Sequence, residues 1–188
     1  MRKLIYPMNT SLDLYVEGTD GNFAWTTPDD ELHKHFNDLI AVATTHLHGR
    51  RMWETMGGYW PTAEADPACT PVMKEFARYW NACEHIVFSR SLQSVEHGAR
   101  LVRDNAVEIV RQLKSGAGSD MLVGGPGLAS TLIAAGLVDE IRPYIHPVAV
   151  GAGKPFLLDL PGQLDLRLLG SHTFANGVVQ LRYAPRTT

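Results

Sequence analysis

A glycine and two arginines stand where a predicted strand passes directly into a predicted helix. The segment reads HGRRMWETMG, in which Gly49, Arg50 and Arg51 occupy the junction. Guanidinium groups bind phosphate through paired hydrogen bonds, and the N-terminus of a helix adds backbone N–H donors. The plain alternative is a pair of solvated surface arginines. The first interpretation predicts a site for a phosphate or pyrophosphate group.

The same chemistry follows a second predicted strand, His85–Phe88. Two hydroxyls and one guanidinium come directly after it, on Ser89, Arg90 and Ser91. In an open α/β sheet, ligands bind beyond the carboxyl ends of the strands. We therefore expect both junctions to lie at one edge of the sheet and to contact the same ligand.

A glycine-rich turn follows a third predicted strand, Met121–Val123. The turn consists of Gly124, Gly125, Pro126 and Gly127, and the apolar spacing of Leu128, Leu132 and Ala135 then predicts a helix that Gly136 ends. Such a turn is often geometry alone, but it also presents unshielded N–H groups and the positive end of a helix dipole. Three junctions of this kind are a stronger indication of a ligand site than any one of them.

Two carboxylates are candidates for chemistry beside a bound ligand. Asp13 lies in a predicted loop, where it either binds a substrate or fixes a turn. Asp30 stands with Asp29 and Glu31 at the start of a predicted helix, and acids in a first turn commonly act as caps. We treat Asp13 and Asp30 as candidate catalytic residues, with the structural roles as alternatives.

Aromatic and histidine side chains extend the set of candidates. Tyr59 and Trp60 follow a Gly-Gly pair, and they either line a pocket for a planar substrate or pack beneath their loop. His46 and His48 share one face of a predicted strand, as metal ligands do. Because no carboxylate or cysteine joins them at ligand spacing, the sequence predicts no metal site.

The composition narrows the class of protein. The chain has 188 residues, of which 45% are hydrophobic and 20% charged, and its net charge is −3. These values predict one globular domain over residues 1–188 and disfavour nucleic-acid binding. No apolar run approaches the ~20 residues that a membrane helix needs. The two cysteines, Cys69 and Cys83, fit free thiols in a reducing cytoplasm.

Predicted strands and helices alternate along the chain. The strands are 3–8, 43–48, 85–88, 100–103, 121–123, 141–150, 164–173 and 178–184, and helices are expected over 28–41, 49–56, 71–81, 106–114 and after Gly127. Residues 11–25 and 57–70 are predicted loops. This order indicates an α/β sheet wrapped by helices and closed by a C-terminal antiparallel hairpin. Pro143 and Pro147 remove donors on one side of their strand, which predicts a sheet edge or a bulge.

Several motifs together resemble the dihydrofolate reductase superfamily. GRRMWETMG, IVFSRSL and MLVGGPG occur in its order and spacing. The span GPGLASTLIAAGLVDEIRPYIHPVAVG is similar to the branch that contains the C-terminal reductase domain of the riboflavin-biosynthesis protein RibD, as is Thr10-Ser11-Leu12-Asp13. The resemblance extends from about Lys3 to Tyr183. It implies about eight mostly parallel strands flanked by helices, with NADPH bound in an extended form.

The resemblance also implies roles in NADPH binding. Arg50, Arg51, Ser89 and Arg90 would hold the 2′-phosphate and pyrophosphate, Gly124 and Gly125 would meet the pyrophosphate and ribose, and Met8, Asn9 and Gly18 would flank the nicotinamide. In relatives a cis peptide joins the two glycines. The neighbouring Gly49, Met52, Ser91, Val123, Gly127 and Leu128 complete the expected cofactor site.

The activity implied is an NADPH-dependent reduction of a C=N or C=O bond in a small heterocyclic or ribosyl substrate. The reaction would be similar to that of 5-amino-6-(5-phosphoribosylamino)uracil reductase, whose substrate motif of two aspartates and a proline is absent here. Trp25, Pro28 and Asp30 reproduce the spacing by which dihydrofolate reductases place a carboxylate in the pterin pocket. A dihydrofolate or pterin reductase therefore remains an alternative, as does a catalytically silent NADPH-binding protein. Trp25, Tyr59 and Trp60 are the expected substrate-binding residues.

The C-terminal hairpin carries an expectation about assembly. Asn176-Gly177 is its predicted turn, between two long apolar strands. Long free edges invite pairing with another chain, and the riboflavin-type relatives pair through their C-terminal strands. We expect a homodimer.

Overall fold

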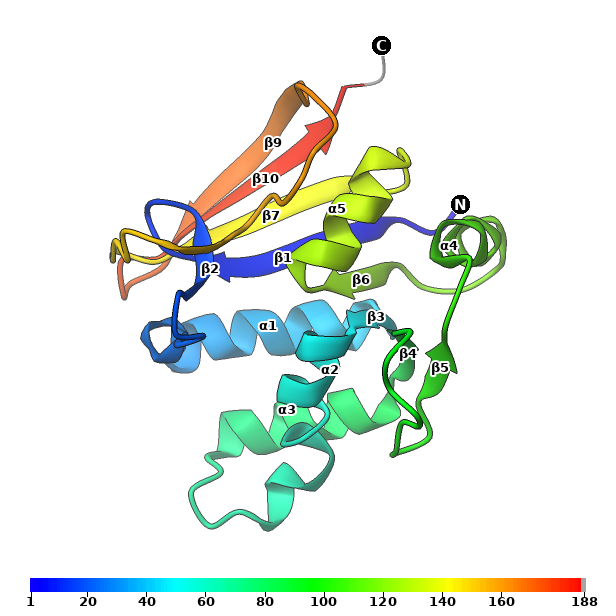
Figure 1. Ribbon diagram of the computed structural model, residues 1–188. Coiled ribbons are helices and arrows are strands. Elements are labelled where there is room, and N and C mark those ends of the chain that lie inside the picture. Colours follow the sequence, from blue (N-terminus) through cyan, green and yellow to red (C-terminus); the bar gives the residue numbers. More distant parts are fainter. Residues whose placement is uncertain (187–188) are drawn as a thin grey trace.

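An eight-stranded sheet forms the centre of the computed structural model, which describes residues 1–186 (Figure 1). The strand order is β5-β4-β3-β6-β1-β7-β10-β9. The bounds are β1 Leu4–Thr10, β3 Thr45–Gly49, β4 Glu84–Phe88, β5 Arg100–Val102, β6 Met121–Gly124, β7 Glu140–Ile145, β9 Leu166–Thr173 and β10 Val179–Pro185. The first six strands in the order are parallel, and β10 and β9 are antiparallel to their neighbours. The predicted α/β fold with a mostly parallel sheet and a C-terminal hairpin is confirmed.

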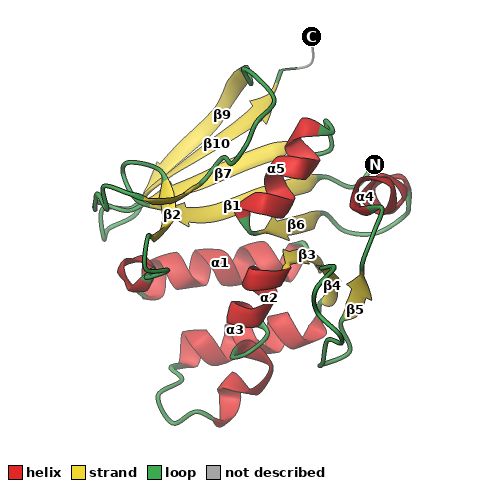
Figure 2. Ribbon diagram, viewed as in Figure 1, coloured by secondary structure: helices red, strands yellow, loops and turns green. Residues whose placement is uncertain are grey.

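Helices cover both faces of this sheet (Figure 2). They are α1 Asp30–Val42, α2 Arg50–Met56, α3 Pro71–Ala82, α4 Ala106–Ser115 and α5 Pro126–Ala134, with short 3₁₀ turns η1 Ala24–Thr26 and η2 Trp60–Ala65. Alternate residues of β1 enter opposite cores, as the two-residue period of a strand requires. Leu4 and Tyr6 join a cluster with α4 and α5, whereas Ile5 joins one with α1, α2 and α3.

Local signals fix the ends of several helices. The side chain of Asp29 accepts a hydrogen bond from the Leu32 amide and caps α1. Thr70 caps α3 in the same way, and Pro71 occupies its first turn. Gly136 has a φ of 68°, so it ends the helix of the third junction in the left-handed conformation predicted for it.

Two short strands were not predicted, and the first of them lies inside the predicted loop 11–25. β2, Tyr15–Gly18, pairs in antiparallel fashion with β8, Gly153–Pro155, to form a separate two-stranded sheet. Four and three residues are too few to show a two-residue hydrophobic period. β2 nonetheless positions a functional group, because Glu17 of this strand lines the cavity described below.

The prediction that Pro143 and Pro147 mark a sheet edge or a bulge is wrong, because β7 is a central strand without a register shift and Pro147 lies beyond its end. β7 lies between β1 and β10, and it ends at Ile145 rather than Val150. Its ladder with β10 includes Ile145, Tyr144 and Ile141 but skips Pro143, which has no N–H to donate. The sheet tolerates Pro143 because only the ladder with β10 is interrupted there. On the other side, β1 pairs along the whole of β7.

A buried carboxylate joins the hairpin to the parallel part of the sheet. Glu140 in β7 is 2% exposed, and its Oε1 accepts from Arg142 at 2.8 Å and from Arg182 of β10 at 2.6 Å. Burial alone would raise the pKa of Glu140, but the hydrogen bonds and charges of the two guanidinium groups outweigh it and hold the pKa below its ordinary value.

None of the helices in residues 1–186 is long and apolar enough to cross a membrane. The predicted domain runs to Thr188, so its last two residues lie outside the described residues.

Candidate functional site

The three predicted junctions lie side by side at the carboxyl edge of the sheet. β4, β3 and β6 are neighbours, and Gly49 pairs with Phe88 while His48 pairs with Gly124. The chain therefore leaves these strands at one level, toward Ser89, Arg50 and Gly125 respectively. The sheet order brings together segments that are up to 75 positions apart in the sequence, because parallel strands present their carboxyl ends on the same side.

The N-terminus of α5 has open backbone donors at this edge. Gly125 is the N-cap residue, with a φ of 96°, and no side chain caps the helix. The first amides of a helix have no intrahelical acceptor, so those after Pro126 remain free. A Cβ built on Gly127 would meet no atom within 4 Å, so this turn faces open space. Such a terminus is suited to an anion.

The other two junctions place charged and hydroxyl groups at the same edge of the sheet. Arg50 and Arg90 are exposed and pair with Glu54 at 3.2 Å and Asp104 at 3.3 Å. The hydroxyl of Ser89 is buried and accepts from the amides of Ser91 and Leu92, so it fixes its own turn. Arg51 reaches across to Glu17 of β2 at 3.1 Å. Within residues 1–186, the ion pairs of Arg50 and Arg90 are exposed on both sides, and an incoming phosphate can replace them at little cost.

A cavity of about 530 Å³ opens beside the edge. Its wall combines residues of β1, β3, β6, α1, α2 and α3 and is mostly apolar. Nine predicted site residues line it: Met8, Asn9, Arg51, Met52, Tyr59, Trp60, Val123, Gly124 and Gly125. The remaining predicted cofactor residues are not part of its lining: Gly18, Gly49, Arg50, Ser89, Arg90, Ser91, Gly127 and Leu128. The cavity therefore adjoins the predicted phosphate region rather than enclosing it.

The two candidate catalytic carboxylates lie outside the cavity lining. Asp13 accepts from the amides of Val150 and Gly151, at 3.2 and 2.8 Å, which is the turn-fixing alternative. The pKa of the Asp13 carboxyl is lowered mainly by a hydrogen bond from the Ser11 hydroxyl, and the hydrogen bonds from these two amides lower it further. Asp30 is exposed in the first turn of α1, and its neighbour Asp29 is the cap. Within α1, His33 and Phe36 line the cavity and Asp30 does not.

Trp25, predicted to bind substrate, is not part of the cavity lining either. It is half-buried outside the cavity lining, and its ring lies edge-on against His146 at 5.8 Å between centroids. Its indole N–H is buried with no hydrogen-bond partner among the described residues. The cis peptide implied for Gly124 and Gly125 is absent, since no peptide bond within residues 1–186 is cis.

Sequence reasoning missed three ionisable residues that line the cavity, Glu17, His33 and Lys154. Glu17 pairs with both Arg51 and Lys154, at 3.1 and 3.7 Å, and so links β2, α2 and β8. No motif identifies Glu17 or Lys154, because their strands are very short. His33 could have been found from the helix period, since it lies three residues before Phe36 on the apolar face.

The ring of His33 is oriented by a polar chain within the helices. Its Nδ1 lies 3.2 Å from the Asn37 Oδ1, and the Asn37 amide donates to the Val72 carbonyl and the Glu75 carboxylate. Because the asparagine nitrogen is used as a donor, its oxygen accepts, and Nδ1 of His33 carries the proton. Nε2 is then an acceptor, and it has no hydrogen-bond partner among the described residues.

A second polar group in the cavity wall is a cluster of three imidazoles. His46 and His48 of β3 lie beside His85 of β4, and one ring nitrogen of each lies within 4.8 Å of the others. Burial lowers the pKa of His46 to about 3, lowers that of His48 well below its ordinary value, and lowers that of His85. All three rings are therefore neutral at pH 7. The sequence analysis paired only His46 and His48, because the position of His85 beside them follows from the register between β3 and β4.

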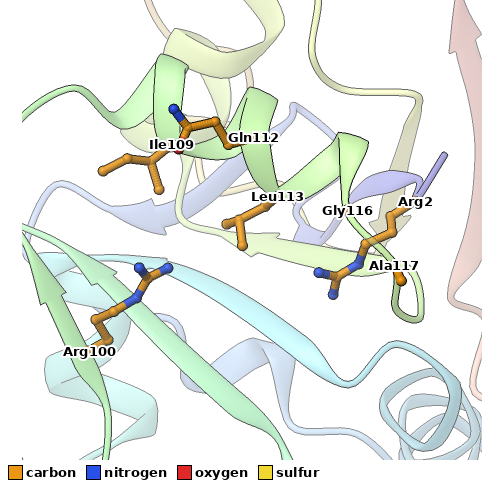
Figure 3. Close-up of a pocket in the computed structure, with 7 residues that line it drawn as sticks. All are labelled: Arg2, Arg100, Ile109, Gln112, Leu113, Gly116 and Ala117. Atoms are coloured by element: carbon orange, nitrogen blue, oxygen red, sulfur yellow. The ribbon is translucent and has the colours of Figure 1, made fainter.

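A separate cavity of about 270 Å³ lies between α4 and β5, at the other end of the strands (Figure 3). Figure 3 shows the guanidinium groups of Arg2 and Arg100 on either side of Leu113. Arg2 donates to the Ser119 carbonyl and the Thr45 hydroxyl. The guanidinium group of Arg2 therefore stabilises the surrounding chain through these hydrogen bonds, and we assign no ligand to this cavity.

The chain matches known proteins along almost its whole length. A family model described as the RibD C-terminal domain matches residues 2–180. The uncharacterized protein YyaP of Bacillus subtilis (strain 168) is 36% identical over 183 residues, which cover 97% of this chain and 94% of YyaP.

Solved structures share the fold at low sequence identity. A pyrimidine reductase-like protein from Corynebacterium diphtheriae has a TM-score of 0.71 at 13% identity, with 100% of this chain and 93% of that chain covered. Dihydrofolate reductase from Enterococcus faecalis, complexed with NADP(H), has a TM-score of 0.66 at 16% identity, with 98% and 97% covered. The similarity of fold agrees with the similarity of sequence, and the chain belongs to the RibD C-terminal domain family.

Proposed function

We propose that this protein is an NADPH-dependent reductase that transfers hydride to a C=N or C=O bond of a small heterocyclic or ribosyl substrate. The observation that carries the proposal is the meeting of three junctions suited to phosphate at one sheet edge, directly beside a mostly apolar cavity. Membership of the RibD C-terminal domain family supports reductase chemistry.

The residues at the sheet edge fit the phosphate-bearing part of NADPH. The uncapped amides of α5 and the guanidinium groups of Arg50 and Arg90 complement phosphate charge. Met8 and Asn9, at the end of β1, line the cavity where the nicotinamide would lie. When bound, the reduced nicotinamide supplies the hydride. The protein contributes position and a dry apolar wall, which are the main means by which such enzymes accelerate hydride transfer.

We assign substrate positioning to His33 instead of Asp30. His33 lines the cavity from α1, and Asn37 fixes its tautomer so that Nε2 is an acceptor. A neutral acceptor suits an N–H group of a pyrimidine ring. Tyr59 and Trp60 line the same cavity and offer aromatic surface to a planar ring.

A pterin reductase is the second candidate. It is favoured by the Trp-x-x-Pro-x-Asp spacing and by a fold shared with dihydrofolate reductase over most of both chains. The exposed position of Asp30 speaks against it, since the spacing matters only if that carboxylate faces the substrate.

The test is NADPH oxidation, followed by absorbance, with a ribosylamino-pyrimidine, a dihydropterin and a cyclic imine. Oxidation with the pyrimidine or the imine supports the proposal, and oxidation with the dihydropterin alone supports the second candidate. If the protein binds NADPH but oxidises it with none of the three compounds, the result contradicts the proposed reductase activity and favours an NADPH-binding protein without catalysis. His33→Phe should raise the KM for the substrate at least tenfold and leave NADPH affinity unchanged, while the exposed His172→Asn should change neither.

We also propose that the protein is a homodimer paired through β9. This strand forms the free edge next to β10, and Leu168 and Leu169 are 54% and 39% exposed. An unpaired edge with exposed apolar residues favours pairing with a second chain.

A further inference from the structure

The three-imidazole cluster formed by His46, His48 and His85 lies in the wall of the cavity and takes no part in the proposed hydride transfer. The three residues are 3%, 4% and 7% exposed. His46 pairs with His85 in the register of β3 and β4, and His48 shares the face of His46 because it lies two positions further. The ring of Trp80 packs against His85, tilted by 32° and 4.3 Å away between centroids. The cluster is therefore held on a rigid sheet.

Backbone carbonyls fix two of the three tautomers. Nε2 of His46 lies 2.9 Å from the Ala43 carbonyl, and Nε2 of His85 lies 2.9 Å from the Trp80 carbonyl. Since a carbonyl can only accept, both Nε2 atoms carry protons, and the Nδ1 atoms of the two neutral rings are unprotonated acceptors. A histidine that donates its second N–H to a carbonyl is the usual arrangement around a bound metal ion.

The third ring is left with an unsatisfied nitrogen. Nε2 of His48 lies 3.1 Å from Nδ1 of His85, to which it must donate. Nδ1 of His48 is then an acceptor, and it is buried with no hydrogen-bond partner in the described part of the chain. Two nitrogens at 3.1 Å are held either by one shared proton or by one shared metal ion, because tetrahedral bonds of about 2.0–2.1 Å separate ligand nitrogens by about 3.3 Å.

We propose that His46, His48 and His85 bind a divalent first-row transition ion, of which zinc best fits three imidazoles. On binding, the ion takes the place of the proton on Nε2 of His48, and that proton moves through solvent to Nδ1 of the same ring. The imidazole of His48 stays neutral, and small shifts of the three rings bring nitrogens that lie within 4.8 Å of one another to ligand spacing.

The site keeps one coordination position toward the cavity. His46 and His48 line the cavity, whereas His85 does not, so the ion would be approached from the cavity side. No carboxylate belongs to the cluster, and the ion would retain its positive charge. Three histidines with an open fourth position form a site that binds water, hydroxide or a substrate heteroatom. The ion would thus attract an anionic or lone-pair-bearing group into the deep end of the cavity.

The test uses the untagged protein and Co²⁺ or Zn²⁺ alone, without NADPH. We expect one ion per chain after dialysis, ligand-field bands of tetrahedral cobalt, and displacement of cobalt by zinc. His48→Asn and His85→Asn should each weaken zinc binding at least tenfold, whereas the exposed His172→Asn should leave it unchanged. Binding that all three variants retain would overturn the site, as would the absence of stoichiometric binding at micromolar zinc.

A measurement on the unaltered protein covers the case in which the variants fail to fold. Zinc should shift the imidazole ¹⁵N resonances of three histidines, one of them with a change of tautomer, and should raise the melting temperature by mass action. Zinc-independent histidine spectra would contradict the proposal even if no variant could be purified.

Discussion

At the scale of single residues, Gly127 separates a structural role from a ligand-binding one. A methyl group there would meet no protein atom within 4 Å and would replace glycine in the first turn of α5. Gly127→Ala should therefore leave the free energy of unfolding unchanged or raise it by up to about 1 kcal/mol. If the pyrophosphate of NADPH approaches this turn, the same methyl group should weaken NADPH binding at least tenfold, as measured by fluorescence titration.

Gly162→Ala provides the matched control. A Cβ at Gly162 also meets open space, but Gly162 belongs to none of the three junctions. Unchanged NADPH affinity in both variants would remove α5 from the cofactor site. Gly125→Ala is less informative, because its φ of 96° strains any residue with a side chain.

At the scale of the elements, substitutions at the start of α1 test whether Asp30 takes part in catalysis or only occupies the first turn of the helix. Asp29 makes the capping hydrogen bond, whereas the side chain of Asp30 makes no hydrogen bond with residues 1–186. Asp29→Ala should destabilise the protein by about 1 kcal/mol in urea unfolding, and Asp30→Ala by less than about 0.5 kcal/mol. With any substrate that the protein reduces, Asp30→Asn should retain the parent turnover. A large fall in turnover without loss of stability would return Asp30 to the active site.

The ion pairs of Glu140 with Arg142 and with Arg182 of β10 predict how the stability of the protein depends on pH. The folded pKa of Glu140 lies below its ordinary value, so its stabilisation is complete above the unfolded pKa. This stabilisation is lost as the pH falls through the lower folded pKa. Glu140→Gln should cost about 3 kcal/mol at pH 7, since it leaves Arg142 buried without its partner.

The control for this change is Glu108→Gln, in an exposed pair with Arg111 whose loss should cost less than about 1 kcal/mol. Chemical denaturation at pH 7 and below pH 4 should show the difference between Glu140→Gln and the parent protein shrinking in acid. An equal difference at both pH values would mean that the charge of Glu140 does not stabilise the protein.

The elements also show what a sequence can reveal. The junctions after Phe88 and Val123 were predictable because apolar runs, caps and glycines are local signals. β2 and β8 were not, because strands of four and three residues carry no period, and with them Glu17 and Lys154 were missed. His85 was not joined to His46 and His48, because that requires the register between β3 and β4. Asp30 was chosen from a spacing, whereas the helix period directs His33 to the cavity.

At the scale of the whole molecule, the free edge of β9 predicts assembly. Light scattering at micromolar concentration should give twice the mass of one chain. Leu168→Asp should halve that mass, because a carboxylate on an edge strand opposes pairing with its own copy. Leu169 is exposed at a β-bulge, where the ladder with β10 skips it, so Leu169→Asp tests whether the partner also contacts this bulge. A single-chain mass for the parent protein would contradict the dimer.

The central claim is that the three junctions form one site for NADPH, and the comparison of NADPH with NADH affinity tests it most directly. Calorimetric titration of the parent protein should show NADPH bound at least tenfold more tightly, since a charge-assisted guanidinium–phosphate pair contributes about 1.5–3 kcal/mol. Arg50→Ala or Arg90→Ala should narrow that preference about tenfold, while Arg78→Ala, in an exposed pair with Glu64, should preserve it. Equal affinity of the parent protein for the two nucleotides would contradict the claim.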